Sequence, residues 1–289
     1  KLGEAEVMVD AGITDIIIAT NLLGAAASGR LTSLQRRISL KVCADNPFSL
    51  AAYSEAAQQA NRVMDVLIEC DTGRHRAGVV TPVEVITLAR IIKNDPMLNF
   101  VGLLFYPPLN GWSQTQEFWK KTKEGLKSLG MSAKIVSTGG TPNFQNIGQL
   151  DGATEHRAGT CIFNDLMMIK AGVAKFEDCA LQVFTSVVSR GAVDRGILDA
   201  GSKTLTSDQS GLEGFGRLLE YPNAIIEKLA EEHGFLDLSK CLNKPNIGDI
   251  VRVIPNHVCV AVNMVDQLVA VRGNEIVDVI PVAARGMLV

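Results

Sequence analysis

The chain has 289 residues, of which 47% are hydrophobic and 20% are charged, and its formal net charge is -3. This length and apolar content are enough for a large core and for one or two domains. The charge argues against nucleic acid as a partner, because nucleic acid needs a basic face and no long run of one sign occurs here. No apolar stretch reaches the length of a membrane span, which argues against insertion in a membrane.

The six cysteines are scattered along the chain, at positions 43, 70, 161, 179, 241 and 259. A chain of this size does not need a disulfide scaffold, so we expect a reducing compartment and a cytoplasmic protein. The sequence begins with Lys1 rather than Met and enters a helical pattern at once. The true start can therefore lie upstream, and a targeting signal there stays open.

Short apolar runs alternate with amphipathic segments over the first half of the chain. The predicted strands are 15–19, 39–44, 64–70, 100–106, 134–137 and a weaker one at 153–157, and the predicted helices are 47–61, 82–94 and 114–129. Pro47 and Pro82 open two of these helices, at a position where the missing N–H of proline costs nothing. Such alternation predicts parallel strands that are joined by helices.

A barrel of this type needs eight strands, whereas the pattern yields six. The chain also begins on a helix that should follow a strand. We therefore predict an α/β fold, a TIM-like (β/α)8 barrel that lacks its first two βα units because the N-terminus is truncated. An open sheet of six strands is the alternative.

The pattern of the sequence changes after residue 172. Strand-like runs follow at 179–190, 196–200, 249–254 and 267–280, and one helix is predicted at 224–233, ended by Gly234. The last run holds two alternating segments around Gly273-Asn274, which indicates a tight hairpin. The sequence thus predicts two domains, an incomplete barrel at 1–172 and a smaller β-rich domain at 173–289.

Three charged or glycine-bearing turns follow predicted strands. The run D-T-G-R-H-R-A-G spans 71–78, S-T-G-G-T-P spans 137–142, and E-H-R-A-G-T spans 155–160. Because a barrel places its chemistry at the carboxyl ends of its strands, these turns are candidates for one site. Glycine backbone N–H groups and hydroxyls bind anions, so the last two turns predict a phosphate cradle. Ordinary turns capped by solvated charges are the alternative.

A second candidate site lies in P-N-H-V-C at 255–259, at the end of a predicted strand. His257 and Cys259 are two residues apart, so in an extended chain their side chains point to one face. Imidazole and thiolate together can bind one divalent metal and leave positions for substrate and water. An isolated H-x-C pair arises mostly by chance, so this pair needs the support of the other motifs.

The motifs and their order resemble those of the alanine-racemase-like pyridoxal-phosphate enzymes of fold type III, and most closely their D-threonine aldolase and D-serine dehydratase branch. The segments that carry the resemblance are 71–78, 155–160, 198–208, 255–259 and 281–286, and it covers essentially the whole chain. It implies a barrel that binds pyridoxal 5'-phosphate, a C-terminal domain with a zinc or manganese site, and a homodimer.

The resemblance also implies roles for individual residues. Arg157 would contact the pyridine nitrogen of the cofactor, and Arg76 would be a catalytic cation beside its phenolate oxygen. The remaining cofactor contacts would be Tyr106, Thr138, Thr141, Gly159 and Thr160, of which the last four would hold the phosphate. His257 and Cys259 would hold the metal.

Enzymes of this family bind the cofactor as a Schiff base with a lysine on the first barrel strand. Lys1 is at the extreme terminus, and Lys203 lies in the second predicted domain. Lys41 and Lys134 lie at the starts of their predicted strands, which is the wrong end. The Schiff-base lysine is therefore expected to be absent from this chain, and the chain is expected to be inactive alone.

The implied function is a lyase that uses pyridoxal phosphate and a metal to cleave D-β-hydroxy-α-amino acids, with D-threonine giving glycine and acetaldehyde. A D-serine or D-threonine dehydratase, which gives a 2-oxo acid and ammonia, is the alternative, and the Cys259 thiolate favours it because thiolate selects zinc over manganese. A non-catalytic homologue that binds the cofactor is the second alternative, because Pro108-Leu109 and Cys161 depart from the pattern of relatives. Alanine racemase itself fits less well, since it has no need of a metal pair.

Overall fold

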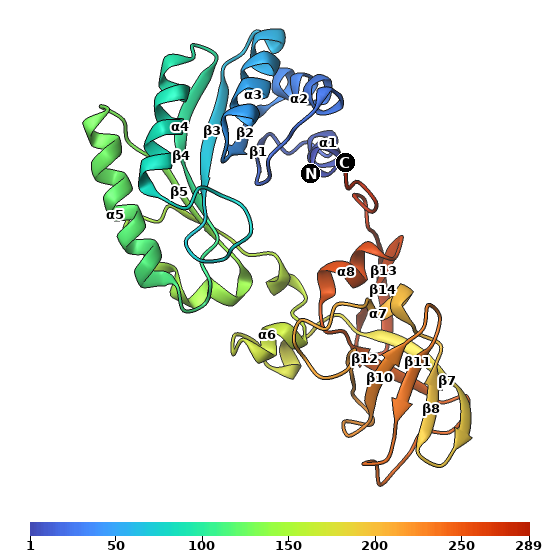
Figure 1. Ribbon diagram of the computed structural model, residues 1–289. Helices are drawn as coiled ribbons and strands as arrows, with labels where there is room; N and C mark the ends of the chain where they lie inside the picture. Colours follow the sequence, from blue (N-terminus) through green and yellow to red (C-terminus); the bar gives the residue numbers. More distant parts are fainter. The chain divides into compact units, whose positions relative to one another are not determined.

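The computed structural model describes residues 1–289, with the exception of the side chain of Ala25, and it divides into two compact units (Figure 1). Unit 1 comprises Lys1–Ala158 together with Gly286–Val289, and unit 2 comprises Gly159–Arg285. The backbone N–H of Gly3 donates to the carbonyl oxygen of the last residue at 2.9 Å, which places the C-terminal tail in unit 1.

Unit 1 is a six-stranded parallel half-barrel whose strands follow sequence order from β1 to β6. The strands are β1 (Asp15–Ile18), β2 (Ser39–Ala44), β3 (Met64–Cys70), β4 (Leu98–Phe105), β5 (Ile135–Gly139) and β6 (Glu155–Arg157), and the helices are α1 (Leu2–Asp10), α2 (Ala25–Arg37), α3 (Pro47–Ala60), α4 (Pro82–Asn94), α5 (Trp112–Ser128) and the 3-10 helix η1 (Thr141–Gln149). Each of the six predicted strands and three predicted helices is confirmed, with ends shifted by a few residues at most. The sequence pattern does not predict α2, whose residues are mostly small or polar.

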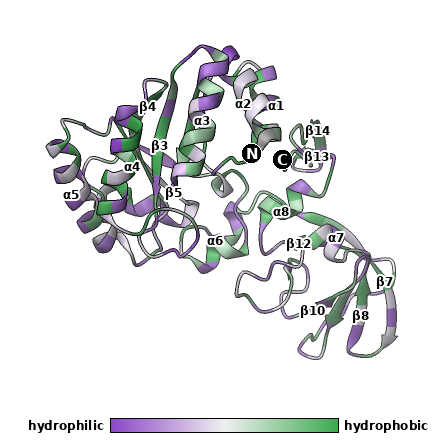
Figure 2. Ribbon diagram, turned by 45° about the horizontal axis from the view of Figure 1, so that its top comes forward, coloured by the Kyte–Doolittle hydropathy of each residue, from purple (hydrophilic) through white to green (hydrophobic). Residues whose placement is uncertain are grey.

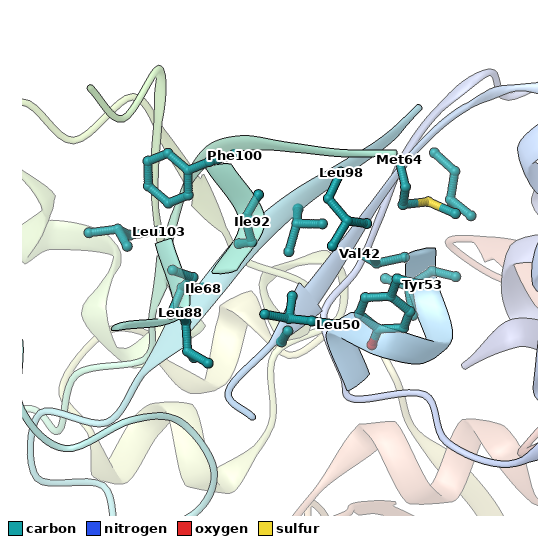
Figure 3. Close-up of a cluster of buried hydrophobic side chains, with 14 of the residues drawn as sticks. Val42, Leu50, Tyr53, Met64, Ile68, Leu88, Ile92, Leu98, Phe100 and Leu103 are labelled. Carbon is teal, nitrogen blue, oxygen red and sulfur yellow. The ribbon is translucent and has the colours of Figure 1, made fainter. Parts of the chain in front are cut away.

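The predicted barrel is present as this half, since β1 and β6 are the two edges of the sheet. Side chains alternate between the two faces along each strand. In β3, Val66 and Ile68 belong to the core under the helices, whereas Leu67 belongs to a smaller cluster on the inner face of the half-barrel. Figure 3 shows the first core, with side chains of α3 and α4 lying among those of the strands.

The helices of unit 1 begin at defined positions. The hydroxyl of Thr81 accepts the N–H of Glu84 at 3.3 Å, and the Glu84 carboxylate accepts the N–H of Thr81 at 2.8 Å. This reciprocal pair is a capping box, and it starts α4 with Pro82 in the first turn. At α3, the side chain of Asn46 accepts the N–H of Ser49 at 2.9 Å. The starts that the two prolines predict are therefore confirmed.

Unit 2 is built on an antiparallel sheet in the order β10-β11-β8-β7-β12-β9, with a separate hairpin of β13 and β14. The strands are β7 (Val183–Ala192), β8 (Arg195–Leu198), β9 (Arg217–Leu218), β10 (Ile225–Leu229), β11 (Gly234–Asp237), β12 (Ile250–Ile254), β13 (Gln267–Arg272) and β14 (Glu275–Pro281), and the short helices are η2 (Thr160–Ile162), α6 (Leu166–Lys170), η3 (Phe176–Asp178), α7 (Ser202–Leu205) and α8 (Val258–Asn263). The hairpin turn predicted at Gly273-Asn274 is confirmed, with φ of +62° at the glycine.

The helix predicted at 224–233 is wrong. Half of that segment is β10, which pairs antiparallel with β11. Ile226 is fully buried in the core of unit 2, and a Cβ on Gly234 would lie 2.8 Å from the carbonyl oxygen of Ala200. Gly234 is therefore needed for close packing inside the sheet rather than for the end of a helix. Burial against neighbouring strands outweighs the helical propensity of the Ala and Glu residues in this segment.

The boundary between the units lies at 158/159, not after residue 172 as the sequence predicted. The carboxylate of Asp165 accepts the N–H of Val258 at 2.9 Å. The N–H groups of Leu166 and Met167 donate to carbonyl oxygens at 255 and 256, at 3.3 and 3.2 Å. These bonds attach the first residues after β6 to the β-rich unit, and a sequence pattern does not reveal contacts of such range.

The helices of unit 1 are amphipathic, which agrees with their place on one side of a sheet. Figure 2 shows hydrophilic residues over much of α5 and hydrophobic residues along the strands. Within the described part of the chain, no helix is both long enough and apolar enough to cross a membrane.

Candidate active site and candidate metal centre

The loop after β3 is folded around the carboxylate of Asp71. Its oxygens accept hydrogen bonds from the backbone N–H groups of Gly73, Arg74 and Arg76, at 2.9, 2.7 and 3.0 Å. Burial works against the charged carboxylate, but these donors hold the pKa of Asp71 below its usual value. Gly78 closes the loop with φ of +114°, and a Cβ there would lie 2.6 Å from the backbone nitrogen of Asp71. These contacts fix the backbone of the loop, and therefore the positions from which the side chains of Arg74 and Arg76 extend.

Both guanidinium groups of this loop lie over the ring of Tyr106, which follows β4. The Cζ atoms of Arg74 and Arg76 are 4.8 and 4.7 Å from the ring centroid, within the range of cation–π contacts. Arg76 also faces the carboxylate of Glu69 at 3.8 Å, and burial raises the pKa of Glu69. The structure thus brings the predicted residues Arg76 and Tyr106 together. The structure also places Arg74 in this group of side chains. In the sequence, only its position two residues before Arg76 indicates this.

The turn after β5 is packed against the same tyrosine. A Cβ on Gly139 would lie 2.7 Å from Nη2 of Arg157, and one on Gly140 would lie 3.0 Å from Cζ of Tyr106. Gly140 also has φ of +96°, which side chains rarely tolerate. The hydroxyl of Thr141, next in the chain, is buried and has no hydrogen-bond partner among the described residues. A phosphate would supply that partner, so the turn fits the predicted cradle.

Arg157 ends β6 on the inner face of the half-barrel. Its guanidinium donates to the Ser137 hydroxyl and to the carbonyl oxygen of Phe105, the latter at 3.0 Å. Burial lowers the pKa of Arg157, and the carboxylates of Glu155 and Glu69 oppose that shift. The acceptors around the guanidinium hold it in one orientation beside Gly139, where the resemblance requires a donor to the ring nitrogen.

Thr138 does not lie on the face of Arg157. Its register partner is His156, whereas Gly139 pairs with Arg157, so the two pairs point to opposite faces of the sheet. The Thr138 hydroxyl is fully buried and lies 2.7 Å from Nδ1 of His156. The structure therefore places the Thr138 side chain away from the phosphate contacts that the resemblance implied, because this side chain points to the face of the sheet opposite to Arg157.

Gly159 and Thr160 follow Arg157 in the chain but belong to unit 2. Gly159 precedes the short 3-10 helix η2, in which Thr160 is the first residue. The Thr160 hydroxyl lies 3.7 Å from Sγ of Cys259. Within unit 2, Thr160 is thus beside a predicted metal ligand, and its predicted contact with phosphate stays a prediction.

The segment of His257 and Cys259 is not the extended strand end that the sequence predicted. His257 has an extended backbone, but α8 begins at the next residue and places Cys259 in its first turn. The two side chains nevertheless interact, and the Cys259 sulfur is the largest cause that raises the pKa of His257 to about 9. The same interaction lowers the pKa of Cys259. A helix start therefore brings the pair together, where the sequence argument assumed strand alternation.

Asp208 orients the ring of His257. Its Oδ2 lies 2.7 Å from Nδ1 of His257. A carboxylate on one ring nitrogen is common behind metal-binding histidines, because it leaves the other nitrogen free for the metal. The described residues contain no group of three or more His, Cys, Asp or Glu side chains that could hold a metal ion. The two-ligand metal site at His257 and Cys259 therefore stays a prediction. Asp208 itself was missed, although it ends the segment 198–208 that carries the resemblance.

The lysines lie where the sequence analysis expected them. The Nζ of Lys41 pairs with Asp15 at the start of β1, which is the end opposite to the loop of Asp71. Lys203 pairs with Glu232 in unit 2 at 2.6 Å. Lys134 precedes the first residue of β5. None of these amines is placed at the carboxyl end of a strand of unit 1.

Comparison with known proteins finds similarity along essentially the whole chain. The family profile of the alanine racemase N-terminal domain matches residues 1–166, and that of a serine dehydratase domain matches residues 180–271. Among curated proteins, the D-threonine aldolase of Arthrobacter sp is 31% identical, and the match covers 99% of this chain and 78% of that protein.

Solved structures give the same picture. The D-threonine aldolase from Filomicrobium marinum superposes with a TM-score of 0.90 at 28% identity, over 100% of this chain and 81% of that one. The D-threo-3-hydroxyaspartate dehydratase from Delftia sp. HT23 superposes with a TM-score of 0.84 at 26% identity, over 97% of this chain and 82% of that one. The chain belongs to the D-threonine aldolase and D-serine dehydratase family, whose N-terminal domain is that of alanine racemase.

Proposed function

We propose that unit 1 binds pyridoxal phosphate and that the protein is a lyase for D-β-hydroxy-α-amino acids, which converts D-threonine to glycine and acetaldehyde. The observation that carries the proposal is the glycine turn after β5. There the buried Thr141 hydroxyl has no partner among the described residues, and the two glycines pack against Arg157 and Tyr106. This set matches both the phosphate and the ring of the cofactor.

Different residues of unit 1 would bind different groups of the cofactor. Thr141 would hold the phosphate, Arg157 would face the ring nitrogen, and Arg76 would lie beside the phenolate oxygen. Pyridoxal phosphate supplies, when bound, an electron sink for a carbanion at Cα of the substrate. A guanidinium donates hydrogen bonds and does not accept them, so Arg157 keeps a proton off the atom that it faces.

The residues of unit 2 would hold a divalent metal. His257 and Cys259 are the ligands, and Asp208 keeps the ring of His257 in one orientation. The metal supplies a Lewis acid that lowers the pKa of the β-hydroxyl of the substrate. The Delftia dehydratase supports this assignment, because its structure in a metal-free form carries an alanine in place of one cysteine. Another variant of that enzyme replaces a histidine two positions earlier, which is the spacing found here.

Dehydratase activity is the second candidate function. The observation that favours it is the thiol of Cys259, since a soft thiolate ligand prefers zinc, and the structure of a cysteine-to-alanine mutant of the Delftia dehydratase is in a metal-free form. In this reaction the bond that breaks is the one between Cβ and the hydroxyl, after loss of the proton at Cα. The products are a 2-oxo acid and ammonia.

One incubation separates the candidates. The protein, expressed from its whole gene, is given pyridoxal phosphate, D-threonine, and either zinc or manganese, and the products are identified by mass spectrometry. Glycine with acetaldehyde supports the aldolase, whereas 2-oxobutyrate with ammonia supports the dehydratase. If neither appears, and D-serine and 3-hydroxy-D-aspartate are also untouched, the non-catalytic alternative gains and the proposal fails.

We expect the 289-residue chain alone to give no product. Its amines at Lys41, Lys134 and Lys203 are at the wrong end of a strand or in unit 2, so no Schiff base with the cofactor should form. The absorbance spectrum of the chain with pyridoxal phosphate tests this directly. A Schiff-base band that borohydride traps on a lysine of unit 1 would contradict the expectation.

A further inference from the structure

His156 joins two parts of the turn that follows β5. Its Nδ1 lies 2.7 Å from the Thr138 hydroxyl, and its Nε2 lies 3.1 Å from the carbonyl oxygen of Gly140. A carbonyl oxygen can only accept, so Nε2 carries a proton. In the neutral ring Nδ1 is then an acceptor, and the hydroxyl of Thr138 is the donor. Burial lowers the pKa of His156, which favours this neutral ring near pH 7.

Gly140 is the residue in the turn that most needs support. Its φ of +96° lies in a region where only glycine is at ease, and glycine has many other conformations open to it. The N–H of Gly140 donates to the carbonyl oxygen of Arg157 at 2.9 Å. The imidazole of His156 binds the other polar group of the same residue, its carbonyl. With both groups bonded, Gly140 cannot rotate without the loss of a hydrogen bond.

The direction of Thr141 depends on that conformation, because Thr141 is attached to the carbonyl that His156 holds. Its hydroxyl is the buried group without a described partner that makes the turn fit a phosphate. The side chain of His156 lies on the face of β6 opposite to Arg157, so it contacts the turn from the face opposite to the proposed cofactor site.

We propose that His156 is a positioning residue, whose hydrogen bond to the Gly140 carbonyl holds the turn in the shape that binds the phosphate of the cofactor. The inference rests on the proposed function, since it assumes that pyridoxal phosphate binds at this turn. The competing explanation is a packing role, because the ring of His156 also meets that of Phe144 edge to face, with centroids 6.2 Å apart.

The test compares two ligands that differ by the phosphate. Dissociation constants of the protein expressed from its whole gene, for pyridoxal phosphate, pyridoxal and inorganic phosphate, are measured by calorimetry. In His156→Leu, we expect about tenfold weaker binding of pyridoxal phosphate and of inorganic phosphate, and unchanged binding of pyridoxal. In His156→Gln, whose amide can donate to the Gly140 carbonyl, we expect affinities within about threefold of wild type.

Two further variants keep the test decisive. Thr138→Val conserves shape and removes the donor to Nδ1, so it should weaken phosphate binding by about threefold even if His156→Leu fails to fold. His233→Leu changes an exposed histidine of unit 2 and should change nothing.

The outcomes separate the two proposals. Wild-type chain that binds neither pyridoxal phosphate nor phosphate would overturn the proposed function and this inference with it. Wild-type chain that binds both, with His156→Leu equally able to do so, would overturn the inference alone. Equal losses for pyridoxal phosphate and pyridoxal would assign His156 a packing role and would also overturn it.

Discussion

The two units hold their charged side chains in different ways. In unit 1, Arg157 lies on a strand, and its guanidinium donates to Ser137 and to a carbonyl of β4. In unit 2, the side chains of Asp208 and His257 are 41% and 22% exposed, and Cys259 is exposed as well. A parallel sheet thus positions the first group, whereas the second depends on one hydrogen bond and on the start of a short helix.

This difference indicates how much each site is formed before its ligand arrives. The proposed phosphate site of unit 1 has its side chains in place, because strand register and tight glycine contacts leave them few alternatives. The proposed metal ligands of unit 2 have fewer restraints, and a bound metal would itself supply the missing ones. Substitution of Arg157 should therefore act on the stability of unit 1, and substitution of Asp208 should act on the ligand affinity of unit 2.

The largest effect is expected for Arg157→Ala. It leaves the Ser137 hydroxyl and the Phe105 carbonyl without their half-buried donor and removes the positive charge that faces Glu155 and Glu69. We expect the free energy of unfolding to fall by about 3 kcal/mol, because two hydrogen bonds from a charged group are lost. Urea unfolding of the 289-residue chain, followed by circular dichroism, measures this.

Two variants serve as references for that measurement. Arg90→Ala removes an arginine from the exposed face of α4 and should change stability by less than about 0.5 kcal/mol. Arg157→Lys keeps a charge without the planar fork and should fall between wild type and Arg157→Ala. A loss as small as that of Arg90→Ala would mean that the guanidinium is not part of a pre-formed site, and the contrast between the units would disappear.

An intermediate effect is expected in unit 2 for Asp208→Ala. Without the carboxylate on Nδ1, the ring of His257 loses its fixed orientation, and the affinity for zinc should fall roughly 10–100-fold. Stability without metal should hardly change, since Asp208 is partly exposed. Competition with a chromophoric chelator gives the affinity, and Asp199→Ala, an exposed carboxylate in the same unit, is the matched control. Equal zinc affinities in the two variants would show that Asp208 does not contribute to zinc binding.

The sequence predicts unit 1 better than unit 2, for a physical reason. In unit 1 each strand is followed by a turn and a helix nearby in the chain, so periodicity and proline positions locate the elements. In unit 2 the strand order β10-β11-β8-β7-β12-β9 joins segments that are far apart. The segment 224–233 has helical composition but forms β10, which pairs with the adjacent β11, and β11 in turn pairs with β8, a strand distant in the chain. Composition alone does not show this pairing.

The candidate sites follow the same rule. The places of Arg76, Tyr106 and Arg157 follow from the ends of predicted strands. The outward direction of Thr138 does not, because it depends on which residue of β5 pairs with Arg157. Asp208 is 49 residues from His257, and only the folded chain brings their side chains together. Hydrogen bonds of that range stay outside the reach of local patterns.

The smallest effect concerns the loop of Asp71, and it depends on pH. The folded chain lowers the pKa of Asp71 from its reference value of 3.8, since three backbone N–H groups bind the carboxylate. An acid with a lowered pKa stabilises the fold above its unfolded pKa, and this contribution is lost as pH falls through the folded pKa. Asp71→Asn should therefore be less stable than wild type by about 1 kcal/mol near neutral pH. The difference should vanish in acid below the folded pKa.

Glu69, two residues earlier, should behave in the opposite way. Burial is the main cause that raises its pKa above the reference value of 4.5, so the charged carboxylate disfavours folding at neutral pH. That penalty disappears as pH falls through the raised pKa to the unfolded value. Glu69→Gln should then be at least as stable as wild type near neutral pH, although it loses the contact with Arg76 at 3.8 Å. Urea unfolding across pH gives the difference in unfolding free energy between wild type and each variant. We expect this difference to change with pH in opposite directions for Asp71→Asn and Glu69→Gln. A change in the same direction would show that the two carboxylates do not have oppositely shifted pKa values.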